Sequence, residues 1–103
     1  WDDYVITGSP INTNGVLTFE NAGTIKPIIQ NDNSQGIRGY DYEVVFSGSI
    51  DVVSAVESRT ITHDTMLPEW YSKPIYNDSV EVIFNVSAGT VVQDLYFKAN
   101  KFL

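Results

Sequence analysis

Apolar and polar positions alternate along most of this chain with a period of two. The longest alternating stretch runs from Gly39 to Ser58. Its first half places four large side chains on one face: Tyr40, Tyr42, Val44 and Phe46. A period of two with one mainly apolar face is typical of a half-buried β-strand. The sequence Ser47-Gly48-Ser49 predicts a turn or bend, so the stretch is interpreted as two central strands of a β-sandwich. Both tyrosines are expected in its core, and the alternative is that they line a concave face.

Shorter strand-like segments, separated by turn signals, fill the rest of the chain. Strands are expected at residues 1–7, 15–20, 24–30, 52–63, 79–86 and 90–100. Asn14-Gly15 and Asn21-Ala22-Gly23 predict tight turns, and the strands flanking the second turn are expected to pair as a hairpin. Pro27 lacks an amide hydrogen, which predicts a sheet edge or a bulge for its strand. No stretch shows helical periodicity beyond one turn. The prediction is an all-β, antiparallel β-sandwich of about seven to eight strands.

Two segments stand apart from the simple core pattern. In the last strand, Val91, Leu95 and Phe97 share one face, so Tyr96 on the other face is expected to be exposed. Residues 64–78 lack regular alternation and contain two prolines and three large aromatic side chains: Trp70, Tyr71 and Tyr76. A long irregular segment in a compact domain is often a functional loop. The alternative for Trp70 is that it folds back over one end of the sandwich as part of the core.

Length and charge narrow the classes of partner. A chain of 103 residues corresponds to one domain, residues 1–103, and its first residue, Trp1, suggests a piece cut from a longer protein. Thirteen acidic residues against six basic ones give a net charge of −7. Such a charge argues against binding to nucleic acid or to anionic membranes. There is no cysteine and no apolar run long enough to span a membrane.

Acid–base chemistry has only one hint in the sequence, His63-Asp64. Adjacent residues on a strand point to opposite faces, so these two side chains cannot pair there. No nucleophile motif accompanies them, and we expect that the protein is not an enzyme. A hydrolase with two carboxylates across a cleft stays an alternative, since nothing singles out a pair among the acidic residues.

The order of strand and turn segments resembles that of carbohydrate-binding jelly rolls, the galactose-binding-like superfamily. The segments that carry the resemblance are N-G-V-L-T-F-E from Asn14, G-Y-D-Y-E-V-V-F-S-G-S-I from Gly39, S-V-E-V-I-F-N-V-S from Ser79 and V-V-Q-D-L-Y-F-K-A from Val91. The resemblance implies a jelly roll and a non-catalytic, lectin-like module. Similar modules occur in phage tail and baseplate adhesins and beside glycoside hydrolases. The resemblance therefore implies an extracellular or virion-surface location and a role in attachment to host or polymeric glycans.

Aromatic residues are the expected contacts for such a glycan. A sugar ring has an apolar face that Trp or Tyr can cover, while polar neighbours bond the hydroxyl groups on its rim. The expected ligand-binding residues are Trp70, Tyr71, Tyr76, Tyr96, Glu69, Asn77, Asp78 and Arg38. Arg38 is included because an arginine can clamp a carboxylate of an acidic glycan, although it would more commonly be solvated.

Family members often hold a structural calcium between a longer first segment and the closing strand, and in this sequence that segment is short or cut away. Here Asp2, Asp3 and Asp94 are the carboxylates that would supply it, and solvated terminal carboxylates are the alternative. No other cofactor is expected. The competing hypothesis for the whole chain is a structural or assembly domain of a virion or fibre, without glycan binding. Such a domain would form a homotrimer or contact neighbouring domains of its parent protein.

Overall fold

The computed structural model describes residues 1–29, 37–77 and 81–101. All regular structure in these ranges is β-strand, as the sequence predicts. The strands are β1 (Tyr4–Ile6), β2 (Ile11–Thr13), β3 (Val16–Phe19), β4 (Gly23–Pro27), β5 (Ile37–Ser54), β6 (Glu57–Asn77), β7 (Ile83–Val86) and β8 (Thr90–Lys101).

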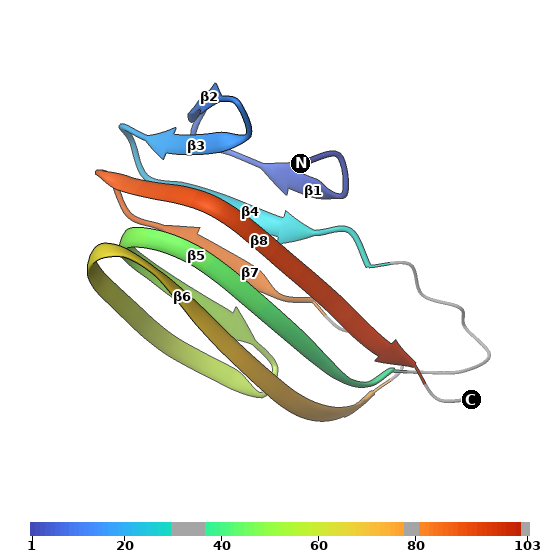
Figure 1. The fold of residues 1–103 in the computed structure, drawn as a ribbon. Helices are drawn as coiled ribbons and strands as arrows, with labels where there is room; N and C mark the ends of the chain where they lie inside the picture. Colours follow the sequence, from blue (N-terminus) through green and yellow to red (C-terminus); the bar gives the residue numbers. More distant parts are fainter. Residues whose placement is uncertain (30–36, 78–80, 102–103) are drawn as a thin grey trace.

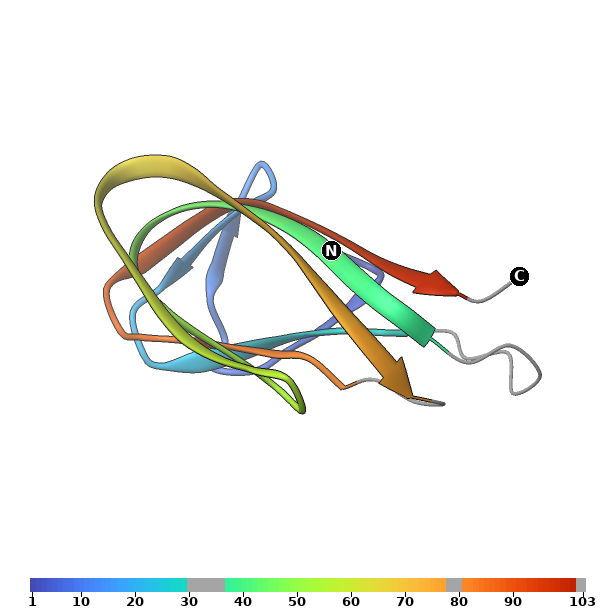
Figure 2. The same ribbon diagram turned by 90° about the horizontal axis from the view of Figure 1, so that it is seen from below.

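Two antiparallel layers face each other and are joined along one side by β5 and β6 (Figures 1 and 2). The strands pair in the order β1-β4-β7-β5-β8-β3-β2, and β6 pairs with β5. We call β2, β3, β8 and the first part of β5 the front layer, and β1, β4, β7 and the last part of β5 the back layer. The predicted antiparallel β-sandwich of jelly-roll type is confirmed.

Strand β5 belongs to both layers. Up to Ser47 it pairs with β8, and from Ile50 it pairs with β7. Between these regions Gly48 has a φ of 120°, a backbone conformation that side chains larger than hydrogen disfavour. The predicted bend at this glycine is correct, but the prediction of two separate strands is wrong. One continuous strand passes from the front layer to the back layer.

Strand β6 follows β5 along its whole length and so also lies in both layers. The chain reverses at the pair Ser54↔Glu57, so the prediction of one bent strand over residues 52–63 is wrong. This turn contains no glycine. Instead the Ser54 Oγ accepts a hydrogen bond of 3.3 Å from the Val56 amide.

The predicted irregular segment at residues 64–78 is also wrong, because β6 is extended up to Asn77. Two prolines, Pro68 and Pro74, suggested a loop. They are tolerated because, among the strands that the structure describes, β6 pairs with β5 alone, which leaves one side of its backbone without a strand partner there.

Two predictions about the first half of the chain need correction. Strands β3 and β4 do not form a hairpin: β3 pairs with β2 and β8, whereas β4 pairs with β1 and β7. Residues 20–22 carry the chain from one layer to the other. Strand β4 is not at an edge, and Pro27 fits because it lies beyond Ile25, the last residue paired with β7. The Asn14-Gly15 turn is confirmed, with positive φ at both residues and β2 paired with β3.

The core lies between the layers and contains Tyr40 and Tyr42, as expected. The ring of Tyr42, in the front layer, lies 5.2 Å from that of Phe84, in the back layer. In β8 the inward residues are Val92 and Leu95, because the pairing with β5 shifts register between them. The expected inward position of Val91 is therefore wrong, whereas Leu95 is buried as expected.

Candidate functional site

The outward face of the front layer presents two exposed aromatic side chains on either side of a carboxylate. Glu43 of β5 lies directly opposite Trp70 of β6 and directly opposite Tyr96 of β8. Trp70 is 65% exposed and Tyr96 is 58% exposed. We call these three residues the aromatic row. With two strand spacings between them, Trp70 and Tyr96 stand roughly 9 to 10 Å apart across the sheet.

Strand alternation explains why both aromatic side chains point outward. Their sequence neighbours Tyr71 and Leu95 are turned toward the space between the layers. The prediction that Tyr96 is exposed is confirmed, and the alternative that Trp70 plugs the core is wrong. Trp70 therefore adds little buried surface to the core, and its exposed ring is available to contact a ligand or a partner.

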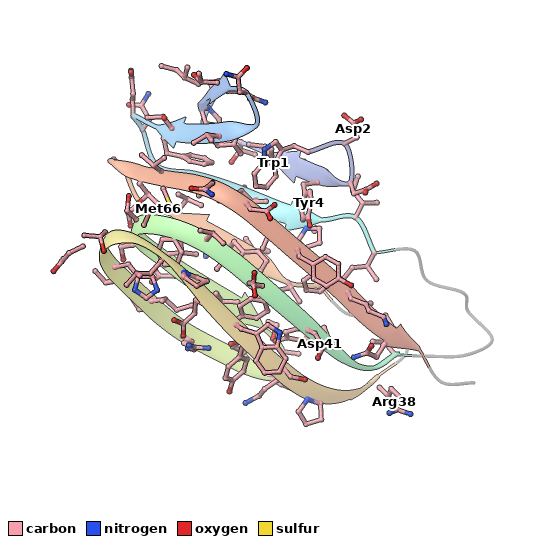
Figure 3. The ribbon with its side chains drawn as sticks, viewed as in Figure 1. Trp1, Asp2, Tyr4, Arg38, Asp41 and Met66 are labelled. Carbon is pink, nitrogen blue, oxygen red and sulfur yellow. The ribbon has the colours of Figure 1, made fainter. Side chains whose placement is uncertain are left out.

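The neighbouring row on the same face is polar and internally bonded. Asp41 lies opposite Ser72 of β6 and opposite Lys98 of β8. Its carboxylate accepts a hydrogen bond from the Ser72 hydroxyl and another, of 3.3 Å, from Asn100 Nδ2. Figure 3 shows Asp41 along β5 and Arg38 near the start of that strand. Arg38 is exposed, consistent with a solvated side chain.

Two predicted ligand-binding residues point away from this face. Glu69 is turned between the layers, where it pairs with Arg59 and where its Oε2 lies 3.3 Å from His63 Nε2. Tyr71 packs against Tyr42, with ring centroids 6.0 Å apart, and the Arg59 guanidinium lies 4.4 Å from its ring centre. The structure therefore does not bring Glu69 and Tyr71 together with Trp70. The side chains of Tyr76, Asn77 and Asp78 lie outside the described residues.

The inward side of β6 forms a polar cluster with β5. Glu57 is only 7% exposed, and its carboxylate accepts hydrogen bonds from Tyr40, at 2.7 Å, and Tyr42, at 2.8 Å. Arg59 and Glu69 lie on opposite arms of β6, so their ion pair links the back and front layers. These contacts connect parts of the fold to one another. They indicate a structural role for these residues.

Burial shifts the ionisation of tyrosines in this core. Loss of solvent raises the pKa of Tyr42, and its bond to the Glu57 carboxylate raises it further. Burial also raises the pKa of Tyr40. Tyr4 shows the same direction, again chiefly because of burial, and its hydroxyl donates to the Leu95 carbonyl at 2.8 Å. These phenols are therefore protonated hydrogen-bond donors at neutral pH.

The suggested calcium ligands do not come together as a cluster. In the part of the chain that the structure describes, no group of three or more His, Cys, Asp and Glu side chains is placed to hold a metal. Asp94 lines a hollow of about 320 Å³ together with Trp1 and Tyr4, but Asp2 and Asp3 do not line it. Calcium binding stays a prediction.

In the residues that the structure describes, no helix is long and apolar enough to cross a membrane.

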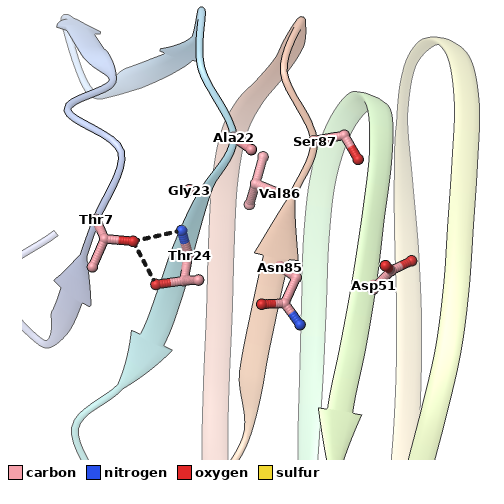
Figure 4. A pocket seen from close by; sticks show the side chains of 8 residues that line it. All are labelled: Thr7, Ala22, Gly23, Thr24, Asp51, Asn85, Val86 and Ser87. Atoms are coloured by element: carbon pink, nitrogen blue, oxygen red, sulfur yellow. Dashed lines mark hydrogen bonds between the residues drawn. The ribbon is translucent and has the colours of Figure 1, made fainter.

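A second hollow, of about 390 Å³, lies on the back layer and is lined by small and polar side chains (Figure 4). The Thr7 and Thr24 hydroxyl groups are hydrogen-bonded at 2.7 Å, and Asp51 lies opposite Asn85. None of the described residues that line this hollow is aromatic. It therefore lacks the apolar surface that the front layer offers.

The chain resembles family 29 carbohydrate-binding modules in fold. A solved structure described as a carbohydrate binding module of family 29 superposes with a TM-score of 0.53 at 12% sequence identity, covering 94% of this chain and 77% of that one. Two mutants of CBM29-2, from work on the mechanism of ligand recognition by family 29 modules, give TM-scores of 0.53 and 0.50. Their identities are 11% and 10%, and each covers 94% of this chain and 79% or 80% of its own. No family model and no curated protein matches the sequence.

Sequence reasoning missed the centre of this face, Glu43. Its outward direction was already visible in the alternation of residues 40–46. The sequence does not reveal which residues lie beside Glu43 in the sheet, because nothing in it states that residues 70 and 96 flank residue 43. Treating residues 64–78 as a loop also concealed that Trp70 and Tyr71 point to opposite faces.

Proposed function

We propose that this chain is a non-catalytic carbohydrate-binding module that holds a glycan across β6, β5 and β8. The observation that carries the proposal is the aromatic row, in which Trp70 and Tyr96 flank Glu43 in register on one exposed face. Aromatic rings cover the apolar C–H face of a pyranose at low entropic cost, because Trp and Tyr have few rotatable bonds.

The arrangement of the row suggests how the glycan lies. Two aromatic platforms separated by roughly 9 to 10 Å match about the span of a disaccharide, with the polymer running across the strands. Hydroxyl groups at the rim would meet the polar side chains of the adjacent row, Asp41, Ser72 and Lys98. The fold shared with carbohydrate-binding modules supports the same conclusion at the level of chain path.

The proposed context is attachment of a larger extracellular or virion protein to cell-surface or polymeric glycans. A single shallow face of this kind binds weakly, and several copies on one particle would raise the overall avidity without new contacts. The competing function is that of an assembly domain. The observation that favours it is Trp70 itself, whose large apolar side chain is 65% exposed and would equally fit a contact with another protein.

Binding can be tested by isothermal titration with a panel of soluble polysaccharides. We expect Trp70→Ala and Tyr96→Ala each to weaken binding by at least about tenfold, or about 1.4 kcal/mol, because each removes one platform. Ile11→Ala is the matched control, since Ile11 is 51% exposed on β2, away from the row. It should leave the affinity unchanged.

Two results would contradict the proposal. One is a complete lack of binding across neutral, amino and acidic glycans. The other is a stable trimer in dilute solution, measured by analytical ultracentrifugation, that Trp70→Ala dissociates. The second result would support the assembly domain, because it would place the exposed aromatic side chain between protomers.

A further inference from the structure

We propose that Glu43 makes the aromatic row selective for glycans that carry protonated amino groups, such as oligomers of unacetylated 2-amino sugars. This inference rests on the proposed function and concerns the same face. It predicts that such glycans bind more tightly than their N-acetylated counterparts, and that uronic acid polymers bind least.

The position of Glu43 is the first argument. It is the direct cross-strand neighbour of both Trp70 and Tyr96, and directly opposite residues have Cβ atoms about 4.5 to 5.5 Å apart. A sugar stacked on either ring therefore brings its substituents close to the carboxylate. An ammonium group there meets a negative charge and the electron-rich faces of the flanking rings, both of which attract a cation.

The availability of Glu43 is the second argument. Its neighbour along the strand, Asp41, is occupied by Ser72 and Asn100 and has Lys98 opposite. By contrast, among the residues that the structure describes, Glu43 is exposed and has no hydrogen bond or ion pair. An unpaired carboxylate beside an aromatic platform adds little for a neutral sugar beyond hydrogen bonding. It adds charge attraction for an ammonium and repulsion for a uronate.

The charge of the surrounding face has the same sign. Among the described side chains on the exposed side of β5 and β8 in the front layer, three carboxylates (Asp41, Glu43 and Asp94) outnumber two cations, Lys98 and Arg38, and Arg38 lies at the start of β5, away from the row. The whole chain carries a net charge of −7, which also attracts a polycation at long range. The experiment must therefore separate the local effect of Glu43 from this general attraction.

The test compares glucosamine oligomers with N-acetylglucosamine oligomers of the same length and linkage, by titration calorimetry at fixed salt concentration and at a pH where the amine is protonated. We expect the wild-type chain to prefer the glucosamine oligomer by about tenfold. Glu43→Gln should remove most of this preference, chiefly by weakening binding of the glucosamine oligomer. The matched control is Glu20→Gln, which removes the same charge from an exposed position outside the row and should keep the preference.

The outcomes distinguish this inference from the proposed function. Equal affinity for both oligomers, still abolished by Trp70→Ala, would overturn the amino-sugar selectivity and leave glycan binding standing. An equal loss of preference in Glu20→Gln and Glu43→Gln would overturn the role of Glu43, because it would show general charge attraction. No binding of either oligomer, or of any neutral polysaccharide, would overturn both.

Discussion

At the scale of single residues, the buried carboxylate of Glu57 depends strongly on its hydrogen-bond donors. A carboxylate at 7% exposure is tolerable only when donors replace its lost water, and Tyr40 and Tyr42 supply them. The Tyr40 hydroxyl also lies 2.8 Å from Ser54 Oγ, at the turn between β5 and β6. These contacts therefore hold the turn end of the β5–β6 hairpin against Tyr40 and Tyr42 of the front layer.

Removing one donor should destabilise the fold at neutral pH. Tyr42→Phe deletes the hydrogen bond to Glu57 Oε2, and we expect the free energy of unfolding to fall by about 1 to 3 kcal/mol. Tyr96→Phe deletes the hydroxyl of an exposed ring and should change it by less than about 0.5 kcal/mol. Urea denaturation measures both values. Similar losses in the two variants would argue against a special role for the Glu57 network.

The raised pKa of both buried tyrosines predicts loss of stability in alkali. In the unfolded chain a tyrosine has a pKa of about 10, whereas burial keeps Tyr40 and Tyr42 protonated to higher pH in the folded state. Their contribution is therefore complete below about pH 10 and is lost as pH rises further, because the unfolded state releases protons first. Urea titrations between about pH 8 and 11 should show this decline. Tyr42→Phe should reduce its slope, and an unchanged slope would contradict the assignment.

At the scale of elements, the bend in β5 is what allows one strand to serve both layers. Gly48 sits at the bend, and a Cβ atom there would lie 2.7 Å from the Thr90 Cα. Thr90 in turn fixes the bend from β8, because its hydroxyl accepts a hydrogen bond of 3.1 Å from the Ser49 amide. The close approach of β8 to β5 thus requires a residue without a side chain.

A pair of glycine substitutions separates this close approach from backbone strain. Gly48 and Gly89 both have positive φ, at 120° and 87°, but a Cβ on Gly89 meets no atom within 4 Å. We expect Gly89→Ala to cost about 1 to 2 kcal/mol from strain alone. Gly48→Ala should cost at least about 3 kcal/mol, because it adds a clash with Thr90. Equal losses in thermal and urea unfolding would show that the approach of β8 is not limiting.

At the scale of the whole molecule, β6 determines how the two layers are held at their shared side. Its first arm pairs with the back-layer part of β5 and its second arm with the front-layer part. The Arg59–Glu69 ion pair closes the space between the arms, with both side chains partly shielded from solvent. The same second arm presents Trp70 on the outside. The inward contacts of β6 therefore support the position of the proposed binding face.

A double-mutant cycle tests this link between the arms. Arg59→Met, Glu69→Gln and the double variant should give a coupling energy of about 0.5 to 3 kcal/mol in urea unfolding. Each single variant should also speed amide exchange in residues 67–74, because one anchor of that arm is lost. Lys26–Glu81, an ion pair with both side chains well exposed, is the control and should show a coupling below about 1 kcal/mol. A coupling near zero for Arg59–Glu69 would contradict the proposed link.

The sequence by itself determined the fold class and the direction of most side chains. Period-two alternation placed Tyr40 and Tyr42 inside and Tyr96 outside, since alternation depends only on local strand geometry. Asn14-Gly15 fixed a turn because its backbone conformation is a local property. The predictions failed at Pro68 and Pro74, because whether a strand accepts proline depends on which side of it is paired. They also failed at the turn after Ser54, because there a side chain bonds the backbone of the turn.

Only the tertiary structure decided which residues stand together. Strand pairing over long sequence separations placed Glu43 between Trp70 and Tyr96, and it turned Glu69 and Tyr71 toward the interior with Arg59. Register across a sheet is set by the packing of a shared core and by bulges such as the one in β8, not by the local sequence of any one strand. The aromatic residues of the proposed site were therefore legible in the sequence, whereas the face they form was not.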